Sequence, residues 1–352
     1  MADFLTGLNE FETADTIATG LGPIYNNISC ISCHSTPSTG GGSTVMVTRY
    51  GQLTNGGFNP FTAEDGSLLH ALAIDPSVQE IIPSAANVIA HRQTTPLYGA
   101  GLIEAIADTR IAAGAVAKEN GVNGTISWVT DEATGALRVG RFGWKAQHAT
   151  LLTFAGDAYT NEIGITNRIF PVQPAPNGNT AALAKFVSLT AGIKDTPDPV
   201  TGKADIDRFH DFMQLLAPLA RGATATGTAA VAGQKVFTQI GCADCHTPSM
   251  KTAPNAVAAL SNQNVPLYSD LLLHDMGSLG DGIAQAAASQ TQMRTSPLWG
   301  LSARRPYLHD GRAATPEEAI LAHAGEGSAS RASYVELPSA TQQDLLAFLG
   351  SL

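Results

Sequence analysis

The sequence has few charged residues and no basic cluster. It holds 20 lysines and arginines against 30 aspartates and glutamates, which gives a net charge of −10. Phosphate recognition needs clustered cations, so this balance excludes nucleic-acid binding. No stretch of 18 apolar residues is present, so the sequence predicts no transmembrane segment. With 352 residues, 44% of them apolar, the chain has material for a sizeable core and a length that suits two domains.

Cysteine is also scarce, and its placement is the strongest signal in the sequence. The four cysteines form two copies of one motif, Cys30-Ile31-Ser32-Cys33-His34 and Cys242-Ala243-Asp244-Cys245-His246. Cys-x-x-Cys-His is typical of haem c attachment: two thiols add to the vinyl groups of one porphyrin, and the histidine gives iron an axial nitrogen. Zinc is a weaker interpretation, because 208 residues separate the cysteine pairs, where zinc ribbons use about 15–20. Redox disulfides would need a βαβ setting, which the sequence lacks.

Landmarks after the two motifs recur in the same order. Thr95–Gly99 (TPLYG) follows the first motif and Ser296–Gly300 (SPLWG) follows the second. Further on, Thr153–Asp157 (TFAGD) matches Ala322–Glu326 (AHAGE). The repeat predicts a duplicated domain, with residues 1–220 around haem 1, residues 228–352 around haem 2, and a small-residue linker between them.

The fold class that we predict is mainly α, with two cytochrome c-like domains. Thr315 and Glu318 form a capping box that starts a helix ending near His323. The first domain is expected to be enlarged by loops. Residues 121–139 alternate enough to form a small β-hairpin across Asp131–Gly135.

Longer motifs resemble a known family. Tyr307–Arg312 (YLHDGR) and Thr315–Ala319 (TPEEA) resemble the C-terminal signature of bacterial di-haem cytochrome c peroxidases, and of the related enzyme that matures the quinone cofactor of methylamine dehydrogenase. Asp270–Gly277 (DLLLHDMG), Arg294–Gly300 (RTSPLWG) and Gly140–Ala146 (GRFGWKA) more closely resemble the di-haem oxidoreductase family, sometimes labelled thiol oxidoreductases. No cysteine is left over for thiol chemistry here.

The resemblance implies two haems with unequal roles, one six-coordinate and one able to open for peroxide. In the peroxidases the distal ligand of the electron-entry haem follows the His-Asp-Gly signature, and that position falls on His323. The second haem is therefore expected to have His246 and His323 as axial ligands, where the peroxidases use methionine. Met276 is the rival distal ligand.

The repeat sets Phe154 opposite His323, and phenylalanine cannot ligate iron. Haem 1 is therefore expected to have His34 and an open distal side, unless a loop supplies one of four donors: Met46, His70, His91 or His148.

Peroxide cleavage needs a proton shuttle beside the iron. Glu104 is the candidate, since it lies in an apolar run after the first Pro-Leu-Tyr-Gly landmark, where burial would raise its pKa. Arg92, Gln93 and Trp144 are expected to line this pocket, and Trp144 is a candidate electron relay.

Our leading hypothesis is a peroxidase-like oxidoreductase, with electrons from a small cytochrome c or cupredoxin entering at haem 2. The alternatives are a pure electron carrier in a respiratory complex and a di-haem enzyme that oxidises a partner protein. Calcium between the domains near Pro306 is also implied, although Arg304 stands where a small residue is usual. Residues Met1–Leu8 lack a secretory signal, so we interpret the chain as a mature periplasmic form.

Overall fold

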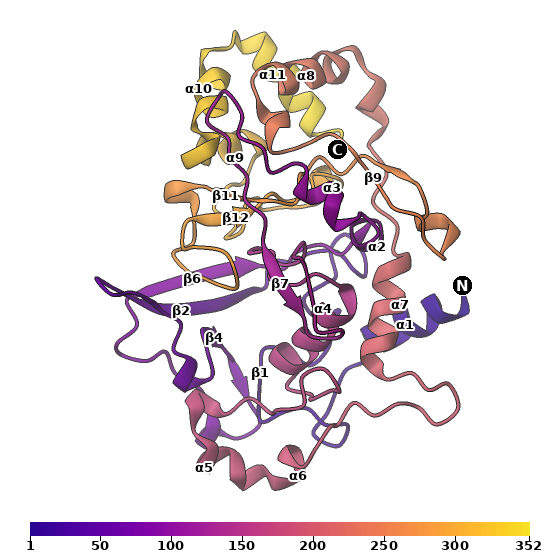
Figure 1. Cartoon of the computed structure of the whole chain (residues 1–352), viewed down its shortest axis with the longest axis vertical. Coiled ribbons are helices and arrows are strands. Elements are labelled where there is room, and N and C mark those ends of the chain that lie inside the picture. Colours follow the sequence, from indigo (N-terminus) through magenta and orange to yellow (C-terminus); the bar gives the residue numbers. More distant parts are fainter.

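The computed structural model describes residues 1–352, and two packed helix pairs organise it (Figure 1). In the first half α1 (Ala2–Glu12) packs on α7 (Asp205–Leu215), and in the second half α8 (Thr228–Gln239) packs on α11 (Ser339–Leu349). Each pair begins and ends its half of the chain, so the two halves share one helical frame. The two helix pairs therefore correspond in order and in packing.

A glycine lets the helices of each pair approach closely. A Cβ on Gly7 would collide with the backbone oxygen of Arg208, and a Cβ on Gly233 would collide with that of Asp344. Four residues after each glycine, a phenylalanine packs into the pair. The ring of Phe11 lies 4.8 Å from that of Phe212, and the ring of Phe237 lies 5.3 Å from that of Phe348.

Replacing Gly233 with alanine is expected to lower the free energy of unfolding by about 1–3 kcal/mol, because overpacking forces the backbones apart. Gly222→Ala is the matched control, since its added methyl group would meet nothing closer than 3.9 Å. Urea unfolding followed by circular dichroism measures both. Equal stability of the two variants would contradict the close crossing.

The remaining helices are short. They are α2 (Ala100–Glu104), α3 (Asp108–Ala112), α4 (Leu151–Ala158), α5 (Thr180–Leu183), α6 (Val187–Thr190), α9 (Pro316–Ala322) and α10 (Ser328–Glu336). A π-helical turn, Tyr159–Ile163, continues α4.

The prediction of a mainly α fold is wrong, because several small sheets are present and strands make up 14% of the chain against 35% helix. The longest strand, β2 (Met46–Thr54), pairs with β3 (Gly57–Asn59), β4 (Leu68–Leu69) and β6 (Val88–Gln93). These segments contain β-branched and aromatic residues, which favour strands, whereas from the sequence we predict loops for this part of the first domain.

The other sheets are two-stranded and antiparallel. They pair β1 (Ile24–Tyr25) with β5 (Leu72–Ala73), β7 (Trp128–Asp131) with β8 (Ala136–Val139), β9 (Met250–Lys251) with β10 (Asn264–Val265), and β11 (Leu273–Asp275) with β12 (Gln292–Arg294). The β7–β8 pair is the hairpin expected across Asp131–Gly135.

The larger of two main hydrophobic clusters crosses the middle of the chain. It has 24 buried residues, and five of them come from residues 250–272 in the second half. A separate cluster of 11 residues surrounds α8 and α11. The predicted domains 1–220 and 228–352 stay a prediction, and the shared core means that the two halves are packed into one another.

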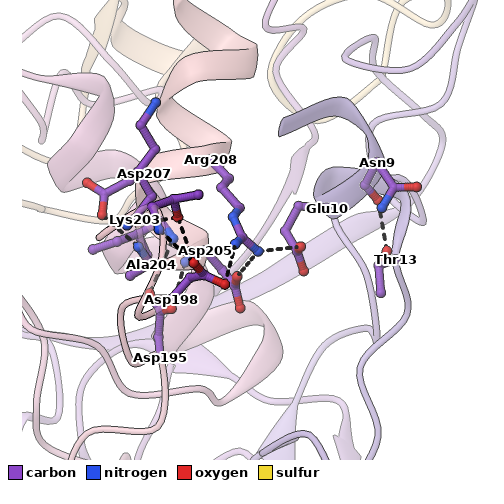
Figure 2. A network of polar contacts seen from close by, with 12 residues as sticks. Asn9, Glu10, Thr13, Asp195, Asp198, Lys203, Ala204, Asp205, Asp207 and Arg208 are labelled. Atoms are coloured by element: carbon purple, nitrogen blue, oxygen red, sulfur yellow. Dashed lines mark hydrogen bonds and ion pairs between the residues drawn. The ribbon is translucent and has the colours of Figure 1, made fainter. Parts of the chain in front are cut away.

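A polar network fixes the start of α7 (Figure 2). The guanidinium of Arg208 lies 3.2 Å from a carboxylate oxygen of Glu10 and 3.3 Å from one of Asp205. The carboxylate of Asp195 accepts hydrogen bonds from the N–H groups of Asp205 and Ile206, at 2.7 and 3.2 Å. Burial raises the pKa of Asp195 to about 6. These contacts hold α7, whose apolar side lines the first of two cavities.

Candidate functional site

Each cysteine motif lies in the wall of a largely apolar cavity. The N-terminal cavity is lined by Cys30, Cys33 and His34, and the C-terminal cavity by Cys242, Cys245 and His246. All four thiols are free of disulfides. Burial raises the pKa of Cys33 to about 11 and that of Cys242 to about 12, so both stay protonated at neutral pH. Two thiols beside an apolar cavity suit covalent attachment of a flat apolar cofactor.

The motif histidines are held alike. The Nδ1 atom of His34 lies 3.0 Å from the backbone oxygen of Gly41, and that of His246 lies 3.0 Å from the backbone oxygen of Tyr268. Holding Nδ1 in this way fixes the ring and leaves Nε2 available as a metal ligand. Burial lowers the pKa of both imidazoles to about 4, so both rings are neutral, as metal ligands must be.

His323 faces His246 in the C-terminal cavity. It follows α9 directly, its Nδ1 lies 2.7 Å from the backbone oxygen of Ala319, and burial lowers its pKa. The ring centroids of His246 and His323 are 6.5 Å apart. A metal–imidazole bond is about 2.0 Å long, so two rings on opposite sides of one metal ion place their centroids roughly 6 Å apart. The pair fits a bis-histidine iron site. Met276 lines the same cavity.

The structure corrects the match between His323 and Phe154. A β-bridge joins Phe142 to His148 in the first half and Tyr307 to Ala313 in the second. Two residues further on, a threonine side chain caps the next helix in each half.

This register pairs His323, eight residues after its capping threonine, with Ala158 rather than with Phe154. The match of Ala-Gly-Asp with Ala-Gly-Glu in the sequence is therefore displaced from this register by one helical turn. Ala158 lines the N-terminal cavity, and its methyl group cannot ligate a metal. In the new register too, the N-terminal cavity has no ligating side chain at the position that matches His323.

The four alternative donors lie outside the wall of the N-terminal cavity. Met46 and His91 are exposed on the β2–β6 ribbon. His70 is buried against Glu80, with Nδ1 at 2.8 Å from the carboxylate. His148 pairs with Asp157, with Nε2 at 3.1 Å from the carboxylate.

Glu104 also lies outside this wall. Its Oε1 accepts a hydrogen bond from the N–H of Leu151 at 2.7 Å, and its Oε2 lies 3.5 Å from Nε2 of His210. Glu104 therefore serves as the hydrogen-bond acceptor for the first N–H group of α4.

The acidic side chain that the sequence reasoning missed is Glu162, which does line the N-terminal cavity. It accepts a hydrogen bond from the amide of Asn26 at 2.8 Å, and burial raises its pKa. It lies in the π-helical turn, one turn beyond Ala158, and such turns are frequent at functional sites. In the correct register Ala158 is the counterpart of His323, and Glu162 lies four residues further along the same cavity wall. The π-helical turn that places Glu162 there has no clear signal in the sequence.

Trp144 lines both cavities. Its indole N–H donates to the backbone oxygen of Gln93 at 2.8 Å, and its ring centroid lies 6.2 Å from that of His309. Two backbone hydrogen bonds, one of them to Trp144 itself, join the halves here. The N–H of Gln93 donates to the oxygen of His309 at 2.6 Å, and the N–H of Arg294 donates to the oxygen of Trp144 at 2.9 Å. One indole is thus part of both walls.

Cationic and amide donors in the cavities fit the propionate groups of haem. Arg294 and Arg304 line the C-terminal cavity, and burial lowers the pKa of Arg294 to about 10. The guanidinium of Arg294 donates only to backbone oxygens, those of Gly143 and Thr295. In the N-terminal cavity, Nε of Arg49 and Nε2 of Gln93 are buried without a hydrogen-bond partner. Buried donors without an acceptor are costly, and a carboxylate-bearing ligand would satisfy them.

The calcium site near Pro306 stays a prediction.

His274, in the wall of the C-terminal cavity, is buried between two carboxylates. Its Nε2 lies 2.8 Å from Asp270 and its Nδ1 lies 2.7 Å from Glu326. Burial alone would lower the pKa of His274, but hydrogen bonds to Asp270 and Cys245 and the charge of Asp270 raise it to about 11. The imidazole is therefore a cation at neutral pH.

The raised pKa of His274 predicts a pH-dependent stability. Between pH 6.5 and about 11 the folded protein holds a proton on His274 that the unfolded chain has released. The free energy of unfolding should therefore fall as the pH rises through this window. Urea unfolding across the window measures the slope, and His274→Asn is expected to flatten it. An identical slope in that variant would contradict the assignment.

No helix in the structure combines the length and the apolar character needed to cross a membrane.

Comparisons with known proteins identify the family. Residues 79–352, which include the second cysteine motif, match the sequence model of the family described as "Di-haem oxidoreductase, putative peroxidase". No curated protein matches the chain.

Similarity to solved structures is distant. Hydrazine synthase from Kuenenia stuttgartiensis has 14% sequence identity and a TM-score of 0.41, over 100% of this chain and 87% of that chain. A MauG-like protein associated with microbial copper homeostasis has 17% identity and a TM-score of 0.44, over 100% and 88%. The diheme peroxidase BthA from Burkholderia thailandensis has 14% identity and a TM-score of 0.44, over 100% and 86%. The family match spans well over half of the sequence, and the chain therefore belongs to the di-haem oxidoreductase family.

Proposed function

We propose that this protein is a periplasmic di-haem c-type peroxidase. A small cytochrome c or cupredoxin would supply electrons to the C-terminal cavity when it holds a haem, and hydrogen peroxide would be reduced to water in the N-terminal cavity. The observation that carries the proposal is the asymmetry of one matched position. His323 faces the motif histidine in the C-terminal cavity, whereas Ala158 holds the equivalent place in the N-terminal cavity.

The residues of each cavity have distinct roles in holding the cofactor. The thiols of Cys30 and Cys33 would bind one haem covalently, and those of Cys242 and Cys245 the other. When bound, the haems supply iron centres for electron transfer and for peroxide reduction. His34 and His246 would each supply an imidazole nitrogen to one iron. His323, rather than Met276, would supply the second protein ligand in the C-terminal cavity, since its ring faces His246 at a separation that fits one iron.

Trp144 is the proposed electron connection. It is the one residue that lines both cavities, which supports a role as the link between them. Hydrogen bonds at its side chain and its backbone oxygen fix its position relative to both halves.

Glu162 is the proposed acid–base residue. It takes the proton from one oxygen of hydrogen peroxide and returns it to the other, and two electrons and two protons complete the reduction to two waters. Burial raises its pKa, which moves a carboxyl group toward the range useful for proton transfer near neutral pH. Ala158, one turn earlier, leaves room for the peroxide.

The test is a stopped-flow assay of the loaded protein with a reduced cytochrome c or cupredoxin and hydrogen peroxide. We expect peroxide-dependent oxidation of the donor with one high-spin and one low-spin iron in the oxidised protein. Two low-spin irons that bind neither cyanide nor carbon monoxide would exclude a peroxidase and support a pure electron carrier. An open iron without peroxide turnover would point instead to oxidation of a partner protein.

A further inference from the structure

We propose that Asp270, His274 and Glu326 form an ionic clamp that holds the loop carrying His323 in its ligating position and so keeps the second iron six-coordinate. The inference rests on the proposed function, because it takes His323 as the distal ligand. The three residues are positioning residues, since they act through His323.

His323 needs an anchor outside its helix. α9 ends at Ala322, and His323 has extended backbone angles, φ −61° and ψ 128°. The helix therefore does not fix the residues that follow. The hydrogen bond between Nδ1 and the oxygen of Ala319 orients the ring, and only a short 3₁₀ turn, Gly325–Gly327, connects the residue after His323 to α10.

Glu326, three residues after His323, supplies this anchor. Its Oε2 lies 2.7 Å from Nδ1 of His274, and its Oε1 accepts a hydrogen bond from the N–H of Asp275 at 3.0 Å. Oε2 also accepts from the N–H of Asn123, in the first half of the chain, at 2.7 Å. One carboxylate thus ties the loop to strand β11 and to the other half of the protein.

The other end of the clamp, formed by His274 and Asp270, is also held by hydrogen bonds. The side chain of His274 is 2% exposed, and its second nitrogen is held by Asp270 at 2.8 Å. The other carboxylate oxygen of Asp270 accepts from the N–H of Leu272 at 3.0 Å. With both ring nitrogens bound to carboxylates, His274 cannot rotate without leaving a charge buried and unpaired, which is strongly unfavourable.

The backbone of the loop also fits closely against β11. Gly325 has a positive φ of 53°, and a Cβ there would collide with the backbone oxygen of Asp275, the last residue of β11. The clamp thus acts on a loop that is already seated on the strand. Removing it should release the loop without unfolding the helices on either side.

Four variants of the full-length, haem-loaded protein test the clamp: Glu326→Gln, His274→Asn, His323→Ala and Glu317→Gln. Glu317 is the matched control, because it lies on the same segment but its carboxylate accepts from the hydroxyl of Tyr334. Electron paramagnetic resonance of the oxidised protein counts low-spin and high-spin irons, and titration with imidazole measures access to the second iron.

We expect Glu326→Gln and His274→Asn to convert part of the second iron to high spin. Their affinity for added imidazole should rise, because the added imidazole competes with a less firmly held His323, and we expect a change of about 10–100-fold, comparable with the loss seen when an outer partner of a metal ligand is removed. Glu317→Gln should match the unmodified protein. Haem content and circular dichroism confirm that each variant is folded, and Glu326→Gln, which keeps the size of the side chain, is the milder of the two clamp variants.

The outcomes separate the clamp from the ligand assignment. If His323→Ala leaves the second iron low-spin, His323 is not its ligand and both proposals fail on that point. If His323→Ala opens the iron while Glu326→Gln and His274→Asn leave it closed, the clamp alone is overturned.

Discussion

Replacing Glu162 with glutamine is expected to lower kcat/KM for hydrogen peroxide by about 10²–10⁴-fold, the usual contribution of a positioned acid–base group. Glutamine keeps the shape of the side chain, and its oxygen can still accept the hydrogen bond from Asn26. It cannot take up a proton from peroxide. The change therefore removes proton transfer while leaving the cavity intact, and stopped-flow mixing with peroxide measures the loss directly.

The control for this prediction is Glu104→Gln. Glu104 also contacts the elements around the N-terminal cavity, but its carboxylate accepts from the N–H of Leu151 outside the cavity wall. Its variant should keep peroxide turnover within a factor of a few. Equal losses in both variants would show that the effect is structural, and full activity in Glu162→Gln would remove Glu162 from the mechanism.

Replacing both cysteines of one motif with serine is expected to remove one covalently bound haem and leave the other. Serine cannot form the thioether bonds, and each motif lines its own cavity. The Cys242→Ser/Cys245→Ser variant should no longer accept electrons from the donor protein. The Cys30→Ser/Cys33→Ser variant should still accept electrons but lose peroxide turnover. Haem staining and the haem-to-protein ratio measure the first effect, and donor oxidation measures the second.

The two double variants control for each other. Each changes two buried thiols to hydroxyl groups in a similar setting, so a general loss of folding would affect both. A protein that keeps two covalent haems after either change would contradict attachment through these motifs. Loss of donor oxidation in the first variant, with retention in the second, would assign the point of electron entry.

The motifs of the site could be predicted from the sequence because their chemistry fixes their spacing. Two thiols and an imidazole must lie on adjacent turns to meet one porphyrin, so Cys30 and His34 stand out in the chain. The threonine cap at Thr315 likewise predicts α9, and the structure shows that helix from Pro316, with the Thr315 side chain accepting from the N–H of Glu318. Local signals of this kind need no knowledge of distant contacts.

The register of the repeat could not be read in the same way. Ala-Gly-Asp and Ala-Gly-Glu match by composition, whereas the true equivalence is set by the bridges Phe142–His148 and Tyr307–Ala313, which are pairings in space. Glu162 was missed because a π-helical turn displaces it from the spacing of an ordinary helix. The strands β2 and β6 stabilise one another through long-range pairing, so neither is evident alone.

The correspondence of Ala158 with His323 also indicates how two similar halves of one chain can acquire different functions. Two copies that start with equal chemistry can diverge by exchanging one side chain at a matched place, provided that the surrounding scaffold tolerates either. Here the scaffold is a capped helix behind a short bridge in both halves. Under the proposed function, the presence or absence of one imidazole would be enough to direct electron transfer to one half and peroxide reduction to the other.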